Sequence, residues 1–197
     1  MKKVLIISFV IMSLNLFSQN FTGGLIGGIS TSQVSGDNLG GYHKAGLFLG
    51  VFTQLPINQI SNLKMEMNFI QKGSNNPKML KNGISDISTS YLEIPVSAHY
   101  YQTEITSFEI GGQIAFLITS TDNDIYGAVS SELINPFNKV DIGAFIGMSH
   151  HLTDKILLNS RISNSILPVR PHASGAIYKL NRGQYNSVLS FTLHYII

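Results

Sequence analysis

Apolar and polar residues alternate along several stretches of the chain. In residues 63–69, which read LKMEMNF, every second side chain is large and apolar and those between are charged or amide. The same alternation runs through residues 91–100 and 108–116. Because successive side chains of a strand point to opposite faces, each stretch predicts a strand with one apolar and one polar face. Several such strands of about ten residues are typical of a transmembrane β-barrel.

The alternation and the turn residues between the stretches predict eight strands. They cover residues 21–31, 44–53, 63–73, 91–101, 107–119, 138–152, 155–166 and 186–197. A closed single-chain barrel with both termini on one side requires an even number of strands. The sequence therefore predicts an all-β fold, an eight-stranded antiparallel up-and-down transmembrane β-barrel.

The connections between these strands alternate in length. Residues 32–43, 74–90, 120–137 and 168–185 form long polar segments, whereas 54–62, 102–106 and 153–154 are shorter. Outer-membrane barrels show this sorting, because short turns lie on the periplasmic side and long loops face outward. The loop lengths thus favour the membrane barrel independently of the strand pattern.

The two faces of each strand can be assigned because bilayer hydrocarbon does not solvate a charge. The apolar faces of residues 63–69, 92–100, 108–118, 140–148 and 189–197 are predicted to face lipid. Residues 44–53 leave the choice open, because Phe48 and Phe52 share a face with Gly46 and Gly50. The set predicted to line the lumen is Lys64, Glu66, Asn68, Glu93, Ser97, His99, Glu109, Gln113, Asp141, Asn159, Arg161, Ser190, Thr192 and His194.

The N-terminus has the pattern of a secretory signal. Lys2 and Lys3 are basic, residues 4–17 are mostly apolar, and cleavage after Ser18 would leave Gln19 as the first mature residue. The apolar stretch is short for a membrane-spanning helix, which needs about twenty residues. We therefore expect a cleaved signal peptide at 1–18, a barrel domain at 19–197 and a location in the bacterial outer membrane.

Composition narrows the functional classes. Without Lys2 and Lys3, the Lys and Arg residues equal the 11 Asp and Glu residues, so the mature chain is near neutral. No basic cluster suggests a nucleic-acid partner. The chain has no cysteine, so neither disulfides nor thiolate metal sites are available.

Acidic residues and a histidine on the lumen face raise the question of catalysis. Glu93, His99 and Glu109 could converge, and acids, bases and histidine are the usual parts of a hydrolytic site. An eight-stranded barrel, however, is just wide enough for its own side chains to fill it, and charges enclosed there must pair. We therefore favour a structural polar network over a catalytic site. Its predicted members are Lys64, Glu66, Glu93, His99, Glu109, Gln113, Asp141, Arg161 and His194.

No motif predicts a catalytic residue, a cofactor or a metal ion. The chain lacks Gly-x-Ser-x-Gly, His-Glu-x-x-His and a phosphate-binding loop. His150 and His151 are adjacent, so on a strand they point to opposite faces and cannot chelate one ion together. Asp122 and Asp124 supply too few oxygen ligands for calcium, which needs six or more.

Four segments carry a resemblance to a known family. The Gly-rich residues 21–31, the segment 44–52, the QKG of residues 71–73 and the YLEIPV of residues 91–96 resemble the PorT-type outer-membrane β-barrel family. The resemblance implies a small barrel in a Gram-negative outer membrane, in a family named after a component linked to protein secretion and gliding. Such barrels usually end on Phe or Trp as an assembly signal, whereas this chain ends Tyr195-Ile196-Ile197. We therefore expect the barrel assembly machinery either to use Tyr195 instead or to insert this chain less efficiently.

The sequence leaves the activity open between three hypotheses. The first is a non-enzymatic structural, adhesion or secretion-accessory protein, held by outer-membrane lipid, whose long extracellular loops bind a protein partner. The second is a narrow channel. The third is a soluble lipocalin-like barrel with its faces reversed, which would turn Met65, Met67 and Ile94 inward to bind an apolar ligand.

Overall fold

The computed structural model describes residues 21–37, 39, 41–75, 86–124, 126–130, 134–171 and 183–197. The predicted signal peptide at 1–18 lies outside these residues. The strands are β1 (Thr22–Ser35), β2 (Lys44–Asn58), β3 (Ser61–Asn75), β4 (Asp86–Tyr101), β5 (Thr106–Asp124), β6 (Gly127–Ala128), β7 (Val140–His151), β8 (Ile156–Ser165) and β9 (Tyr185–Ile196).

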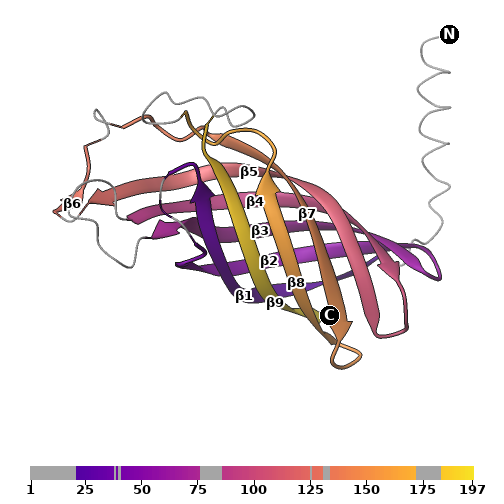
Figure 1. Cartoon of the computed structure of the whole chain (residues 1–197). Helices are drawn as coiled ribbons and strands as arrows, with labels where there is room; N and C mark the ends of the chain where they lie inside the picture. The colour runs from indigo at the N-terminus through magenta and orange to yellow at the C-terminus, as the bar shows by residue number, and fades with distance from the viewer. Residues whose placement is uncertain are drawn as a thin grey trace, which may run out of the picture.

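The sheet closes into a barrel (Figure 1). Its strand order is β4-β3-β2-β1-β9-β8-β7-β5, and a β4–β5 pairing joins the two ends. Every pairing is antiparallel, and the short β6 only extends the ladder at the tip of β5. The predicted fold class, an eight-stranded antiparallel up-and-down barrel, is therefore confirmed. Among the described residues, no helix has the length and apolar character needed to cross a membrane.

The strands lie where the alternation predicts them, but several are longer. The predicted connection at 54–62 is wrong, because Leu55 pairs with Leu63 and Asn58 with Ser61, so β2 and β3 continue almost to the turn. Pro56 is tolerated there because β1 begins at Thr22, opposite Gln54. Beyond that point β2 is an edge strand, where a missing backbone N–H costs little.

The outer ends of β3, β4 and β5 are also longer than predicted. The first residue of β7, Val140, pairs with Phe116, which leaves the last part of β5 beyond β7. The outer part of β4 pairs with this part of β5, from Ser90–Thr119 to Asp86–Asn123. The three strands therefore continue as a sheet past the ends of β1 and β9 (Figure 1).

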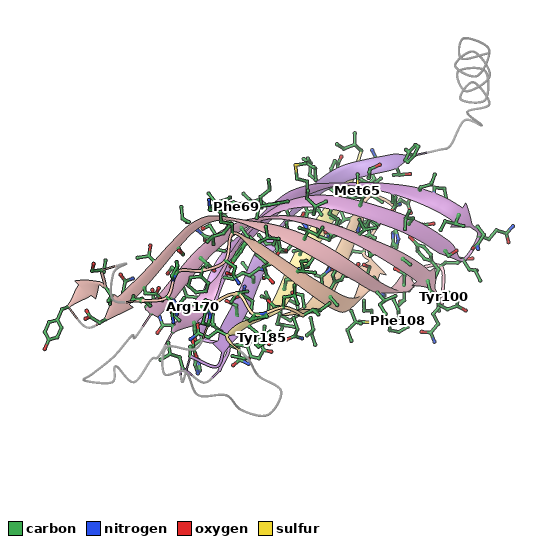
Figure 2. All side chains as sticks on the ribbon, turned by 90° about the horizontal axis from the view of Figure 1, so that it is seen from above. Met65, Phe69, Tyr100, Phe108, Arg170 and Tyr185 are labelled. Carbon is green, nitrogen blue, oxygen red and sulfur yellow. The ribbon has the colours of Figure 1, made fainter. Side chains whose placement is uncertain are left out.

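Apolar side chains cover the outside of the barrel and polar side chains fill its interior. Met67 is 51% exposed, whereas the neighbouring Glu66 is only 2% exposed. Side chains such as Met65 and Phe108 surround the ribbon on its outer face (Figure 2). The faces are thus opposite to those of the lipocalin-like alternative, in which Met65, Met67 and Ile94 would point inward.

The face of β2 that the sequence left open is also resolved. Phe48 and Phe52 point inward and are 3% and 6% exposed, whereas Leu47, Leu49 and Val51 are exposed. The inward glycines make room for this arrangement, because a Cβ at Gly50 would collide with the side chain of Asn68 on β3. Glycine at position 50 therefore allows the backbone of β2 to lie close to the side chains that fill the lumen.

Two apolar clusters accompany the polar interior. The first lies among the barrel strands and consists of Ile26, Phe48, Phe52, Ile70, Tyr91, Ala115 and Val188. The second brings strand ends and loop residues together and consists of Val34, Leu39, Ile87, Phe137 and Val169. Because Leu39, Phe137 and Val169 come from three different connections, this second cluster closes the loop end of the barrel.

Candidate functional site

We call the half of the lumen nearer the short turns the inner half, and the half nearer the long connections the outer half. Arg161 on β8 is the centre of the inner half. Its Nη2 and Nη1 atoms donate to Oε1 and Oε2 of Glu66 on β3 at 2.8 and 3.0 Å. Its Nε and Nη2 atoms donate to Oε1 and Oε2 of Glu109 on β5 at 2.8 and 3.1 Å. Two bidentate pairs of this kind are among the strong interactions available to side chains. They connect β8 to β3 and β5 across the interior of the barrel.

Lys64 extends this inner cluster toward β9. Its Nζ atom lies 2.8 Å from Nδ1 of His194 and 3.7 Å from Oε1 of Glu66. The ammonium group can only donate, so Nδ1 of His194 accepts and its Nε2–H donates to Oγ1 of Thr192 at 2.9 Å. This pattern defines a neutral imidazole held between a cation and a hydroxyl.

Ser97, His99 and Glu109 resemble the parts of a hydrolytic triad, but their geometry differs. Both Oγ of Ser97 and Oε2 of Glu109 lie 3.1 Å from the same ring atom, Nε2 of His99. A catalytic histidine uses one ring nitrogen for the nucleophile and the other for the orienting carboxylate. All three side chains are buried. The arrangement therefore lacks the geometry of a relay, and Glu93 belongs to a different cluster.

That second cluster lies in the outer half of the lumen around Lys72. The Lys72 ammonium pairs closely with Glu93 and lies 3.7 Å from Oδ2 of Asp141. Gln113 donates to Glu93 at 3.1 Å, and Asn186 donates to Asp141 at 2.9 Å. Lys72 is absent from the predicted set, although the inward alternation of β3, continued two residues at a time from Lys64, reaches it.

Arg170 lies at the loop end of the barrel and is also absent from the set predicted to line the lumen. It is buried, donates to Oδ2 of Asp122 at 2.9 Å and bonds to Gln184. Figure 2 shows Arg170 near the end opposite to Tyr100 and Phe108. No periodicity marks a residue in a connection, so the sequence pattern did not predict its burial.

Asp37, in the connection after β1, lies near this end as well. Its Oδ1 atom accepts a hydrogen bond from the backbone N–H of Leu39 at 2.7 Å. Burial raises the pKa of the Asp37 carboxyl above its ordinary value, although hydrogen bonds and the charge of Arg170 oppose that shift. Ionisation of the Asp37 carboxyl is therefore less favourable in the folded chain than in water.

Four buried cations of the interior and its loop end each lie over an aromatic ring. The distances from the cation to the ring centre are 4.6 Å for Lys64 over Phe52, 4.9 Å for Lys72 over Tyr91, 4.2 Å for Arg161 over Phe145 and 4.1 Å for Arg170 over Phe137. Such contacts stabilise a cation more strongly when water is excluded. The rings therefore compensate part of the cost of burying four positive charges.

The histidine pair and the loop acids have separate roles. Nδ1 of His150 lies 3.0 Å from Oγ1 of Thr106, whereas the ring of His151 lies beside that of Tyr101. Asp122 binds Arg170, and Oδ1 of Asp124 accepts from the backbone of the turn that follows it. Within the described residues, no group of three His, Cys, Asp or Glu side chains could hold a metal ion.

A closed antiparallel barrel with an apolar exterior and an ion-paired interior is the architecture of a small bacterial outer-membrane protein. The chain belongs to the outer membrane protein beta-barrel domain family, whose sequence model matches residues 17–169. The location predicted from the sequence, the bacterial outer membrane, is thereby confirmed. No curated protein matches the chain in sequence.

Solved structures of outer-membrane proteins share the fold. The attachment invasion locus protein Ail of Yersinia pestis matches with a TM-score of 0.53 and 11% identity, over 89% of this chain and 98% of Ail. Neisserial surface protein A matches with a TM-score of 0.51 and 13% identity, over 89% of this chain and 96% of that protein. Ail in a phospholipid bilayer nanodisc matches with a TM-score of 0.50 and 12% identity, over 89% and 99%.

Proposed function

We propose that this outer-membrane barrel is a non-enzymatic, non-conducting protein that acts in adhesion or as an accessory of secretion. It would present to a protein partner the part of its sheet in which β3, β4 and β5 continue beyond the other strands. The observation that carries the proposal is the extension of β3, β4 and β5 beyond the other strands. On β5 the apolar outward residues end at Ile118, and Thr119 and Thr121 follow. This part of the sheet is therefore polar outside and suited to water.

The edge of β5 provides a way to bind. On the side of β7, the backbone N–H of Leu117 donates to the carbonyl of Lys139, and the carbonyl of Asp122 accepts from Val129. β7 pairs with β5 only as far as Phe116, so residues 118–121 lie beyond the ladder between these two strands. Residues 118–121 are exposed, and an unpaired strand edge can add an extended segment of another chain.

The filled lumen favours this role over the channel hypothesis. A water-filled pore would leave its lining side chains accessible, whereas the side chains of the predicted lumen set are all buried. Arg161, for example, bonds to both β3 and β5 across the interior. These bonds favour a rigid anchor over a passage for ions.

Three finer features belong to the same proposal. The resemblance of residues 91–96 and 71–73 to PorT-type barrels supports a role connected with secretion. Ail is named for attachment and invasion, which is compatible with the adhesion variant of the proposal. We also propose cleavage of the signal peptide after Ser18 and insertion by the barrel assembly machinery.

Site-specific photo-crosslinking in native outer membranes tests the proposal. A photoreactive residue replaces Thr121 on the exposed edge, and matched variants place it at Met67 on the lipid face and at Asp154 in the β7–β8 turn. We expect a discrete protein adduct from position 121 that is absent from positions 67 and 154. Adducts of equal yield at all three positions, or none at 121 and its neighbours, would contradict an edge-binding role.

A further inference from the structure

The buried charges are balanced in one half of the lumen and not in the other. In the inner half, Lys64 and Arg161 face Glu66 and Glu109. In the outer half, Lys72 alone among the described residues faces two carboxylates, Glu93 and Asp141. An uncompensated charge in a buried site is costly, so the outer cluster calls for one more positive charge.

Three oxygen atoms of this outer cluster lack hydrogen-bond partners among the described residues. They are Oδ1 of Asp141, Oδ1 of Asn186 and the hydroxyl oxygen of Tyr91. The side chains are 3%, 2% and 0% exposed, respectively. Buried polar atoms in native proteins are nearly always satisfied by protein, water or an ion. Three unsatisfied oxygens in one cluster therefore point to a bound species.

The three side chains reach the same place from β7, β9 and β4. The amide nitrogen of Asn186 donates to Oδ2 of Asp141 at 2.9 Å, so both residues have one oxygen left over. Tyr91 reaches the same place, because the Lys72 ammonium that lies over its ring is 3.7 Å from Oδ2 of Asp141. The Lys72 ammonium lies 4.9 Å from the Tyr91 ring centre and is paired closely with Glu93. The Lys72 ammonium therefore contacts Glu93, Oδ2 of Asp141 and the ring of Tyr91, and the three unsatisfied oxygens lie outside these contacts.

We propose that these oxygens bind a small monovalent cation, Na⁺ or K⁺, inside the outer half of the lumen. Asp141 would supply the negative charge, and the amide oxygen of Asn186 and the hydroxyl of Tyr91 would complete the protein ligands. A divalent ion such as calcium would bring one positive charge too many to a cluster with one excess carboxylate. A single positive charge matches the single excess carboxylate. The site is independent of the proposed partner-binding role.

Thermal unfolding in different salts tests the proposal. The mature chain, folded in lipid vesicles, is heated in NaCl, in KCl and in choline chloride at equal ionic strength, so that screening of surface charge is constant. Choline is too large for the enclosed site. We expect a midpoint at least about 3 °C higher in NaCl or KCl than in choline chloride, with saturation as the cation concentration rises.

Three variants make the test specific. Asp141→Asn removes the charge, and Tyr91→Phe removes one ligand while keeping the ring over Lys72. Asp154→Asn removes the same charge from an exposed turn. We expect both lumen variants to lose the difference between salts and Asp154→Asn to keep it. If Asp141→Asn does not fold, the salt dependence of the unfolding midpoint of Tyr91→Phe alone tests the site. Equal midpoints of the unmodified chain in all three salts, or a difference that persists in Tyr91→Phe, would overturn the cation site in favour of water or a proton.

Discussion

The hydroxyl of Ser32 accepts a hydrogen bond from the backbone N–H of Gly73 at 2.9 Å and donates one to the carbonyl of Gly73 at 3.1 Å. The ladder between β2 and β3 ends with Phe48 opposite Ile70, so Gly73 lies beyond it. Ser30 similarly donates to the carbonyl of Gln71 at 2.8 Å. Two serines of β1 thus bond, through the interior, with a backbone edge that β2 has left.

Ser32→Ala is expected to destabilise the barrel. The substitution leaves a buried N–H and a buried carbonyl of β3 without this partner, at a cost of about 1–3 kcal/mol. The free energy of unfolding in urea, measured in lipid vesicles, checks the value. Ser160→Ala on the outward face of β8 is the matched control and should change it by less than about 0.5 kcal/mol. Equal effects of the two substitutions would show that the interior bonds contribute little.

Arg161→Met is expected to be the most damaging substitution in the inner cluster. It leaves Glu66 and Glu109 buried without their bidentate partner, which costs about 3–5 kcal/mol in comparable buried pairs. Adding Glu66→Gln and Glu109→Gln removes the stranded charges and should restore most of the lost stability. Urea unfolding of the single and triple variants measures this. A triple variant as unstable as Arg161→Met would mean that packing, and not charge, sets the cost.

Adjacent positions on β3 test the assignment of the two faces. Met67→Arg places a charge on the lipid side and should reduce folding, by about 2–4 kcal/mol if it lies at the bilayer midplane. Glu66→Gln keeps an amide in the lumen and should cost less, because Arg161 retains Glu109. Folding yields in lipid vesicles, read from gel mobility, compare them. Normal folding of Met67→Arg together with failure of Glu66→Gln would reverse the faces.

Asp37→Asn should stabilise the loop end of the barrel at neutral pH. The pKa of Asp37 is raised in the folded chain, so the unfolded chain loses this proton first, and stability falls as pH rises above about 3.8 toward the raised value. Asparagine keeps the oxygen that bonds to Leu39 and removes the charge. The difference in unfolding free energy between variant and parent should grow in the variant's favour across that pH window. If the difference in unfolding free energy between variant and parent did not change with pH, titration of Asp37 would not be its cause.

Period-two alternation predicted the barrel because each strand has one face in lipid and one in the lumen. It predicted Lys64, Glu66, Glu109 and Arg161 as inward residues, since a charge has no stable place in hydrocarbon. It did not predict which lumen residues form ion pairs with each other, because partners such as Arg161 and Glu66 lie on strands far apart in sequence. Pairing depends on strand order and stagger, which period two does not encode.

The errors at strand ends have a different cause. Residues 54–62 contain Pro56 and two asparagines, which predict a connection when read locally. β2 remains a strand there because it pairs with β3, and Pro56 is tolerated because β1 does not reach that far. Both facts depend on the arrangement of the whole barrel. Similarly, Arg170 follows no periodicity, and its burial depends on Asp122, Gln184 and Phe137 from other segments. Such residues become recognisable only once the closure of the sheet is known.

The unmodified chain should show no steady porin-scale conductance in planar lipid bilayers. Arg161 and its two carboxylates bridge the inner half, Lys72 and its partners occupy the outer half, and Arg170 lies over Phe137 at the loop end. An eight-stranded barrel leaves room for side chains and little else. A barrel of more strands, inserted under the same conditions, provides the positive control. Stable wide openings of the unmodified chain would contradict the filled lumen and favour the channel hypothesis over a surface-anchored binding protein.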